Sequence, residues 1–343
     1  MTSKLQSLVF ILLIPLVLGS CADQQSFAKE DKLENFFAKK EVTVAVMDSG
    51  LGGLSIMADA LERMREGGIF RGAHFVFFNA LFSSEGGYNS LRKRGEKIRI
   101  FDSALKSLEN HYNPDLILVG CNTLSILYRD TMFSRQTQIP VKGIVEDGVE
   151  LIATNLKTHP ESKVIVFGTQ TTVSEGTYER KLTERGFLRE RIVSQACPDL
   201  VPYIEKGHGG DETEMLIYAY VDEALQKIGK GDAPLYVSFN CTHYGYSQEL
   251  WTKAFQSFGI TPLGFLNPNT RMNDFLFSNQ MRSRFEKTDV SAQVVSMVSI
   301  DKSRIDSIGS WLRELSPLTA EALQNYIHRP DLFEWKKFLH SER

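Results

Sequence analysis

The sequence predicts an α/β fold of two doubly wound parallel-sheet lobes, related by a pseudo-twofold axis, with the site in the cleft between them. Five short runs are rich in β-branched and aromatic residues without strict alternation, which is typical of strands buried on both faces. Segments with helical periodicity separate them, and this order favours parallel strands joined by helices. The runs are EVTVAVMD, AHFVFFNA, PDLILVGC, KVIVFGTQ and PLYVSFNC.

The segments between these runs have the spacing of amphipathic helices. Leu54, Met57, Leu61 and Met64 are three or four residues apart, and residues 98–108 repeat the pattern. After residue 246, the stretches TPLGFL and QVVSMVSI are strand-like, and SPLTAEALQNYIHRPDLFEWKKFL predicts a closing amphipathic helix.

The predicted division of the chain follows from these elements. It comprises a signal peptide over residues 1–20, a tether over 21–41, a first lobe over 42–143 plus 246–343, and a second lobe over 144–245.

The first twenty residues have the pattern of a targeting segment. Lys4 precedes an apolar run over residues 8–18, eleven residues long. A membrane-spanning helix needs about 20 residues, so the run fits the core of a secretory signal. The following Leu-Gly-Ser-Cys21 resembles a bacterial lipobox, in which Cys21 carries a lipid. A plain secretory signal with an incidental cysteine is the alternative.

A lipid on Cys21 predicts a membrane-anchored, periplasm-facing protein of the cell envelope. Ala22, rather than Asp, follows that cysteine, which favours the outer membrane where there are two. The formal net charge of −3 gives no basic footprint for nucleic acid. The sequence leaves open whether two copies form a homodimer.

Two cysteines stand at the ends of strand-like runs, in GCNTLS and NCTHYG. Cys121 and Cys241 lack the spacing of zinc ligands, and a cysteine protease needs only one nucleophile. Two equivalent thiols suit stereoinversion, in which one base removes a proton from one face of a carbon and an acid returns one to the other. The turn DSGLGGLS, which follows the first strand, is either an anion cradle or simple turn chemistry.

With these motifs, the chain resembles cofactor-independent glutamate racemases of the aspartate/glutamate racemase superfamily. The similar stretches are DSGLGGLS, CNTLS, GTQTT, ACPDLVPYIEKG and CTHY, and they cover residues 42–250 in family order. The resemblance implies that no cofactor or metal is needed and that the substrate is an acidic amino acid, most simply glutamate, with aspartate as the alternative.

The resemblance also implies roles for individual residues. Cys121, assisted by Asp48, would take the α-proton of the D-enantiomer, and Cys241, assisted by His243, that of the L-enantiomer. The residues that would bind the substrate are Ser49, Gly86, Gly87, Asn122, Thr123, Thr169, Thr172 and Thr242. The third thiol, Cys197, precedes Pro198 and is interpreted as structural.

The chain departs from the family pattern in four places. The loop over residues 83–90 lacks the usual Pro-Tyr and contains Glu85, Asn240 replaces a Gly, and Gly245 and Asp147 each replace a Pro. Glutamate racemases ordinarily supply D-glutamate for peptidoglycan inside the cytoplasm, which an exported protein cannot do directly. The rival hypothesis is therefore an exported amino-acid-binding protein on a racemase fold, without turnover.

Overall fold

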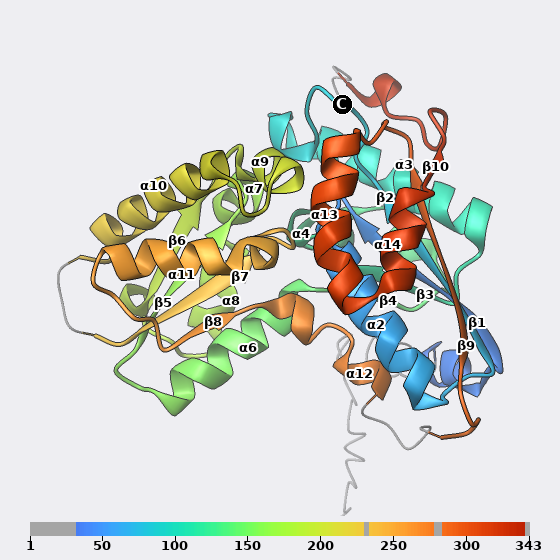
Figure 1. The fold of residues 1–343 in the computed structure, drawn as a ribbon, viewed down its shortest axis with the longest axis horizontal. Helices are drawn as coiled ribbons and strands as arrows, with labels where there is room; N and C mark the ends of the chain where they lie inside the picture. The colour runs from blue at the N-terminus through green and yellow to red at the C-terminus, as the bar shows by residue number, and fades with distance from the viewer. Residues whose placement is uncertain (1–31, 230–232, 278–282, 340–343) are drawn as a thin grey trace, which may run out of the picture.

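The computed structural model describes residues 32–229, 233–277 and 283–339, which fold into two lobes that each contain a parallel sheet (Figure 1). The first sheet has the strand order β10-β9-β2-β1-β3-β4, and the second has the order β6-β5-β7-β8. The predicted fold class is confirmed. The bounds are β1 Glu41–Asp48, β2 Gly72–Asn79, β3 Leu116–Val119, β4 Val141–Gly143, β5 Lys163–Gly168, β6 Ile192–Ala196, β7 Leu235–Asn240, β8 Gly264–Leu266, β9 Asp289–Ser296 and β10 Ile327–His328.

Helices connect the strands and cover both faces of each sheet (Figure 1). In the second lobe, α10 and α11 lie on one side of the sheet and α6 on the other. The α-helices are α2 Leu54–Gly67, α3 Arg94–Tyr112, α4 Asn122–Leu127, α5 Phe133–Gln136, α6 Val145–Thr158, α7 Gln170–Ser174, α8 Thr177–Glu184, α9 Leu200–Lys206, α10 Asp211–Ile228, α11 Gln248–Ser257, α12 Asp274–Phe277, α13 Lys302–Leu315 and α14 Pro317–Gln324. The 3-10 turns are η1 Tyr88–Ser90, η2 Tyr128–Asp130, η3 Arg189–Arg191, η4 Tyr244–Ser247, η5 Pro268–Thr270 and η6 Lys336–Phe338.

The apolar spacing that predicts the first helix corresponds to its buried face. Leu54, Met57, Leu61 and Met64 of α2 are all fully buried. In the described part of the chain, no helix combines the length and apolar character that a membrane crossing would require.

The register of the strands places their carboxyl ends at one edge of each sheet. Asp48, at the end of β1, is opposite Asn79 of β2, and β3 ends two residues before Cys121. In the second sheet, Gly168 of β5 is opposite Asn240 of β7, one residue before Cys241. Ligands of doubly wound folds bind at such edges, so both thiols lie where a ligand site is expected.

The second lobe extends further than its predicted end at residue 245. Strand β8 pairs with β7, and α11 carries Trp251, whose ring lies 4.6 Å from that of Phe167 and 5.4 Å from that of Phe239. Trp251 is completely buried, and it is buried in the core of the second sheet. Burial of this large aromatic side chain stabilises the second lobe. The chain therefore returns to the first lobe only after β8.

The predicted closing helix is also shorter than expected. Helix α14 ends at Gln324, and the chain then pairs with β9 as the short strand β10. Leu332 and Phe333 beyond it are buried in the first lobe, beside the core of β2 and α3. Pro330 cannot donate a helical hydrogen bond, which favours this extended course over a continued helix.

Candidate functional site

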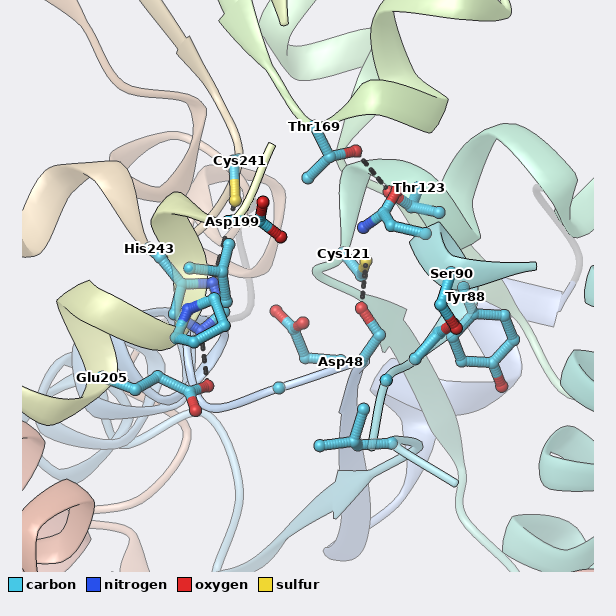
Figure 2. A pocket seen from close by; sticks show the side chains of 18 of the residues that line it. Asp48, Tyr88, Ser90, Cys121, Thr123, Thr169, Asp199, Glu205, Cys241 and His243 are labelled. Carbon is cyan, nitrogen blue, oxygen red and sulfur yellow. Dashed lines mark hydrogen bonds and ion pairs between the residues drawn. The ribbon is translucent and has the colours of Figure 1, made fainter. Parts of the chain in front are cut away.

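Both strand-end thiols open into one cavity of about 570 Å³ (Figure 2). Cys121 comes from the first lobe, where it caps α4, and Cys241 from the second lobe, after β7. Their exposed fractions are only 6% and 5%. The cavity is thus shared by both lobes and presents one thiol from each.

Burial keeps the Cys121 side chain in its protonated form, although the nearby Ser49 hydroxyl opposes this effect. Ser49 Oγ is 3.1 Å from Cys121 Sγ. Burial, and next the negative charge of Asp48, raise the pKa of Cys121 to about 12. At neutral pH this side of the cavity therefore holds a thiol that can donate a proton.

Asp48 is a buried carboxyl group between the two halves of the site. Its exposed fraction is 1%, and Thr242 Oγ1 donates a hydrogen bond of 2.9 Å to Asp48 Oδ2. Burial raises the pKa of Asp48 to about 6, although the nearby His243 and the Thr242 hydroxyl oppose the rise. The Thr242 contact also joins the two lobes, because Asp48 ends the first strand of the other sheet.

His243 links Cys241 to a carboxylate. Its Nδ1 lies 3.8 Å from Cys241 Sγ, and its Nε2 lies 2.8 Å from Glu205 Oε1. Burial would lower the pKa of His243, but the interactions with Cys241 and Glu205 together raise it to about 10. The ring is therefore an imidazolium at neutral pH, and a cation beside a thiol favours the thiolate.

Glu205 belongs to the site, although sequence reasoning did not single it out. The backbone N–H of Leu51 donates a hydrogen bond of 2.9 Å to Glu205 Oε1, and Arg304 Nη1 lies 3.3 Å from Glu205 Oε2. Burial would raise the pKa of Glu205, but His243 first, then Leu51 and Arg304, hold it below its ordinary value. The one feature of the sequence that could have identified Glu205 was its position in the stretch ACPDLVPYIEKG. Arg304 belongs to α13, about a hundred residues further along the chain.

The glycines after β1 allow the two lobes to approach closely. A Cβ atom on Gly52 would lie 2.2 Å from Thr242 Oγ1 and 2.6 Å from His243 Nδ1. A Cβ on Gly53 would lie 2.8 Å from Asp48 Oδ2. The space beside these glycines is therefore occupied by side chains of the site, and the turn serves close packing.

Asn122 and two threonines line one side of the cavity, and Figure 2 shows Thr123 and Thr169 at its upper edge. Tyr178 Oη donates a hydrogen bond of 2.6 Å to Asn122 Oδ1, while the buried Asn122 Nδ2 has no hydrogen-bond partner in the part of the chain that the structure describes. Thr123 Oγ1 and Thr169 Oγ1 are 2.9 Å apart. Thr172 lies behind this wall, 3.0 Å from Thr169 Oγ1, rather than on the lining itself.

Known proteins similar to this chain are glutamate racemases, although no family model matches it. The glutamate racemase of Aquifex pyrophilus is 30% identical over 202 residues, which cover 59% of this chain and 70% of that protein. That of a Nitratiruptor species is 27% identical over 206 residues, covering 60% and 72%.

The chain belongs to the glutamate racemase family.

This amino-acid racemase, an isomerase, also shares its fold with solved glutamate racemases. The structure from Campylobacter jejuni subsp. jejuni superposes with a TM-score of 0.59 at 20% identity, covering 79% of this chain and 98% of that one. The structure from Francisella tularensis subsp. tularensis, in complex with D-glutamate, has a TM-score of 0.61 at 19% identity, covering 79% and 94%.

The loop over residues 83–90, where the racemase departs from its family, forms the cavity wall on the Cys121 side. Gly86 and Gly87 both line the cavity, and Glu85 is exposed at its rim. The Thr171 N–H donates a hydrogen bond of 3.2 Å to Asn89 Oδ1, so the loop is held against α7 of the other lobe.

The other departures have local physical reasons. Asp147 forms an ion pair with Lys142 of β4, outside the residues that line the cavity. A Cβ on Gly245 would lie 2.5 Å from Asn267 Nδ2, so a larger residue at this position would have to displace the Asn267 amide. Asn240 is completely buried, and neither of its side-chain polar atoms has a hydrogen-bond partner within the described ranges.

Cys197 lines the cavity but is 2% exposed, and burial raises its pKa well above the ordinary value. Across residues 32–229, 233–277 and 283–339, no three His, Cys, Asp or Glu side chains gather as metal ligands do. Cys21 and the targeting segment lie outside the described residues.

Proposed function

We propose that this racemase interconverts the enantiomers of glutamate without a cofactor, with Cys121 and Cys241 acting on opposite faces of the α-carbon. The observation that carries the proposal is the shared cavity: one thiol enters it from each lobe, and each has its own polar neighbour. A binding protein would have no need of two thiols that enter one cavity from opposite lobes.

The reaction from L- to D-glutamate begins with a thiolate at Cys241, supported by the His243 imidazolium. This thiolate takes the α-proton, and the C–H electron pair remains on the substrate as a carbanion delocalised into its carboxylate. The Cys121 thiol then donates its proton to the opposite face. Cys241 ends as the thiol and Cys121 as the thiolate, so no proton is gained or lost, and the reverse reaction exchanges their roles.

The carbanion needs hydrogen-bond donors that are fixed in advance and shielded from water. Asn122 Nδ2 is such a donor, since it is buried and has no partner among the described residues, while Tyr178 hydrogen-bonds to the oxygen of the same amide. The hydroxyl groups of Ser49, Thr123 and Thr169 are further neutral donors on the lining. We assign these groups to the substrate carboxylates.

The test is to incubate the reduced enzyme with each enantiomer of glutamate and to follow optical rotation. The wild type should bring both enantiomers to the racemic mixture, and Cys121→Ser and Cys241→Ser should each lose this activity. Binding of glutamate without any inversion would instead favour the rival binding function. Aspartate, tested in parallel, reports the substrate preference.

We also propose that a lipid on Cys21 holds the enzyme at the membrane of the cell envelope, where it would act on amino acids outside the cytoplasm. The chain enters the first lobe through a helix over residues 32–38, whose Phe36 and Phe37 pack on Phe70. This helix precedes the amino end of β1, whereas the cavity lies at the carboxyl end. A tether that precedes residue 32 would therefore leave the cavity accessible.

The variant Cys21→Ala tests the anchor. It should release the protein into the soluble fraction, and retention of the variant in membranes would refute the anchor.

A further inference from the structure

A buried lysine of the first lobe contacts the helix that follows part of the cavity wall. Lys97 of α3 is only 8% exposed, and its Nζ donates a hydrogen bond of 2.7 Å to Thr171 Oγ1. Thr171 belongs to α7 of the second lobe and is itself 2% exposed. Neither residue lines the cavity. The contact therefore joins the two lobes directly behind the site.

The surroundings of Lys97 do not favour a charge. A buried ammonium group normally pairs with a carboxylate, because an uncompensated charge in the interior is costly. Lys97 instead donates to a neutral hydroxyl, and it forms no ion pair with any residue that the structure describes. Burial lowers the pKa of Lys97, while the charge of Glu175 opposes this shift and that of Arg94 adds to it. Since the folded protein disfavours the charged form, the charge of Lys97 lowers the stability at neutral pH.

The contact of Lys97 belongs to a set of three, which we call the α7 clamp and which consists of Asn89, Arg94 and Lys97. Asn89 Oδ1 accepts a hydrogen bond of 3.2 Å from the Thr171 N–H. Arg94 Nε lies 3.0 and 3.1 Å from the two carboxylate oxygens of Glu175, the residue that ends α7. Because α7 is only five residues long, contacts near both of its ends fix the whole helix against the first lobe.

The position of α7 decides where one of the predicted substrate-binding hydroxyl groups lies. The helix starts directly after Thr169, which lines the cavity. Thr169 Oγ1 accepts a hydrogen bond of 3.2 Å from the Thr172 N–H of α7 and lies 2.9 Å from Thr123 Oγ1 of the first lobe (Figure 2). A shift of α7 would therefore separate the Thr169 and Thr123 hydroxyl groups, which we assign to the substrate carboxylates.

Within the α7 clamp, Lys97 makes the contact that is best shielded from water. The side chain of Arg94 is 43% exposed and is shared between Glu175 and Asp130. Exposed ion pairs contribute little and are screened by salt. The Lys97–Thr171 hydrogen bond is buried at both ends, so it is the contact of the clamp that most restricts the position of α7.

We propose that Lys97 is a positioning residue, whose hydrogen bond to Thr171 holds α7, and with it the Thr169 hydroxyl group, in the geometry that binds a substrate carboxylate. The assignment rests on the proposed racemase function. Lys97 touches neither the substrate nor a reacting atom, so it acts equally on binding in the ground state and in the transition state. Its loss should therefore raise KM and leave kcat nearly unchanged.

The experiment replaces Lys97 by an uncharged side chain of similar length. Lys97→Met should raise the KM for both enantiomers of glutamate, and the Kd measured by calorimetry, about tenfold, the lower end of what a hydrogen bond from a charged group contributes. Urea unfolding should show the variant to be at least as stable as the wild type, because a buried charge has been removed. The control Lys106→Met removes the same charge from an exposed position of α3 and should leave KM, Kd and kcat unchanged.

A second variant removes the other partner of the same hydrogen bond. Thr171→Val should raise KM and Kd as Lys97→Met does, but it should also destabilise the protein, since it leaves the ammonium group buried without an acceptor. The double variant should weaken binding no more than either single variant, because the two residues act through one contact.

Two results would overturn the assignment of Lys97. One is an unchanged glutamate affinity in Lys97→Met, and the other is a weakened affinity that accompanies a loss of stability, which would make the lysine merely structural. Failure of the racemase function has a different signature, namely a wild-type enzyme that binds glutamate without inverting it. The Kd values of the variants would then still decide whether Lys97 positions the binding site.

Discussion

The ion pair between His243 and Glu205 can be tested by the variant Glu205→Gln. The substitution keeps the shape of the side chain but removes the negative charge that lies 2.8 Å from His243 Nε2. Both side chains are only 4% exposed, and Arg304 contacts the same carboxylate. Removing one member of a buried pair leaves the other charge uncompensated, which costs about 3–5 kcal/mol.

The loss should depend on pH in a defined direction. The pKa of His243 in the folded protein is raised from 6.5 to about 10, so its stabilising contribution is complete below pH 6.5 and disappears as the pH rises toward 10. The pKa of Glu205 is lowered from 4.5, so its contribution is complete above that value and is lost only in more acidic solution. The variant should therefore be most destabilised between about pH 4.5 and 6.5.

The assay is urea unfolding of the reduced protein at a series of pH values from 4 to 10. Arg304→Gln should cost less, about 1 kcal/mol, because the guanidinium is partly exposed. Glu321→Gln, an exposed position on α14, is the control for charge and should have little effect. A difference between wild type and Glu205→Gln that is below 1 kcal/mol, or equal at every pH, would refute the reasoning.

Three further predictions concern the packing and protonation of the site. Gly52→Ala should lower kcat/KM at least tenfold, since the added methyl must displace Thr242; steady-state kinetics that match the wild type would contradict this. The rate should fall below pH 6 as Asp48, with its pKa raised to about 6 by burial, becomes protonated, and Asp48→Asn should remove that acidic limb of the pH profile. Trp335→Ala removes the ring 5.0 Å from Phe82, beside the cavity loop, and should destabilise the protein by about 1 kcal/mol in the same urea assay and raise KM; unchanged values would show that the loop needs no such support.

The sequence was sufficient to place the two thiols because a parallel sheet brings its strand ends to one edge. Cys121 and Cys241 each follow an apolar run directly, so their convergence needs only the doubly wound topology. The same holds for Asp48 after β1. These residues are local in the sequence and their positions follow from the strands before them.

Residues contributed by tertiary packing could not be placed in this way. Glu205 faces His243 because α9 packs beside the turn after β7, and Arg304 reaches it from α13 of the other lobe. The extent of the second lobe was likewise decided by the burial of Trp251 in its core. No periodicity within one segment reports such contacts between segments.

The central claim, two thiols on opposite faces of one carbon, is tested most directly by the fate of the α-hydrogen. L-Glutamate is incubated with the reduced enzyme in deuterated water, and both enantiomers are separated early in the reaction and analysed by mass spectrometry. A separate acid on the far face predicts deuterium in nearly all of the new D-glutamate and protium in the remaining L-glutamate. New D-glutamate that keeps the original protium would mean that a single group moves the proton, and would contradict the account.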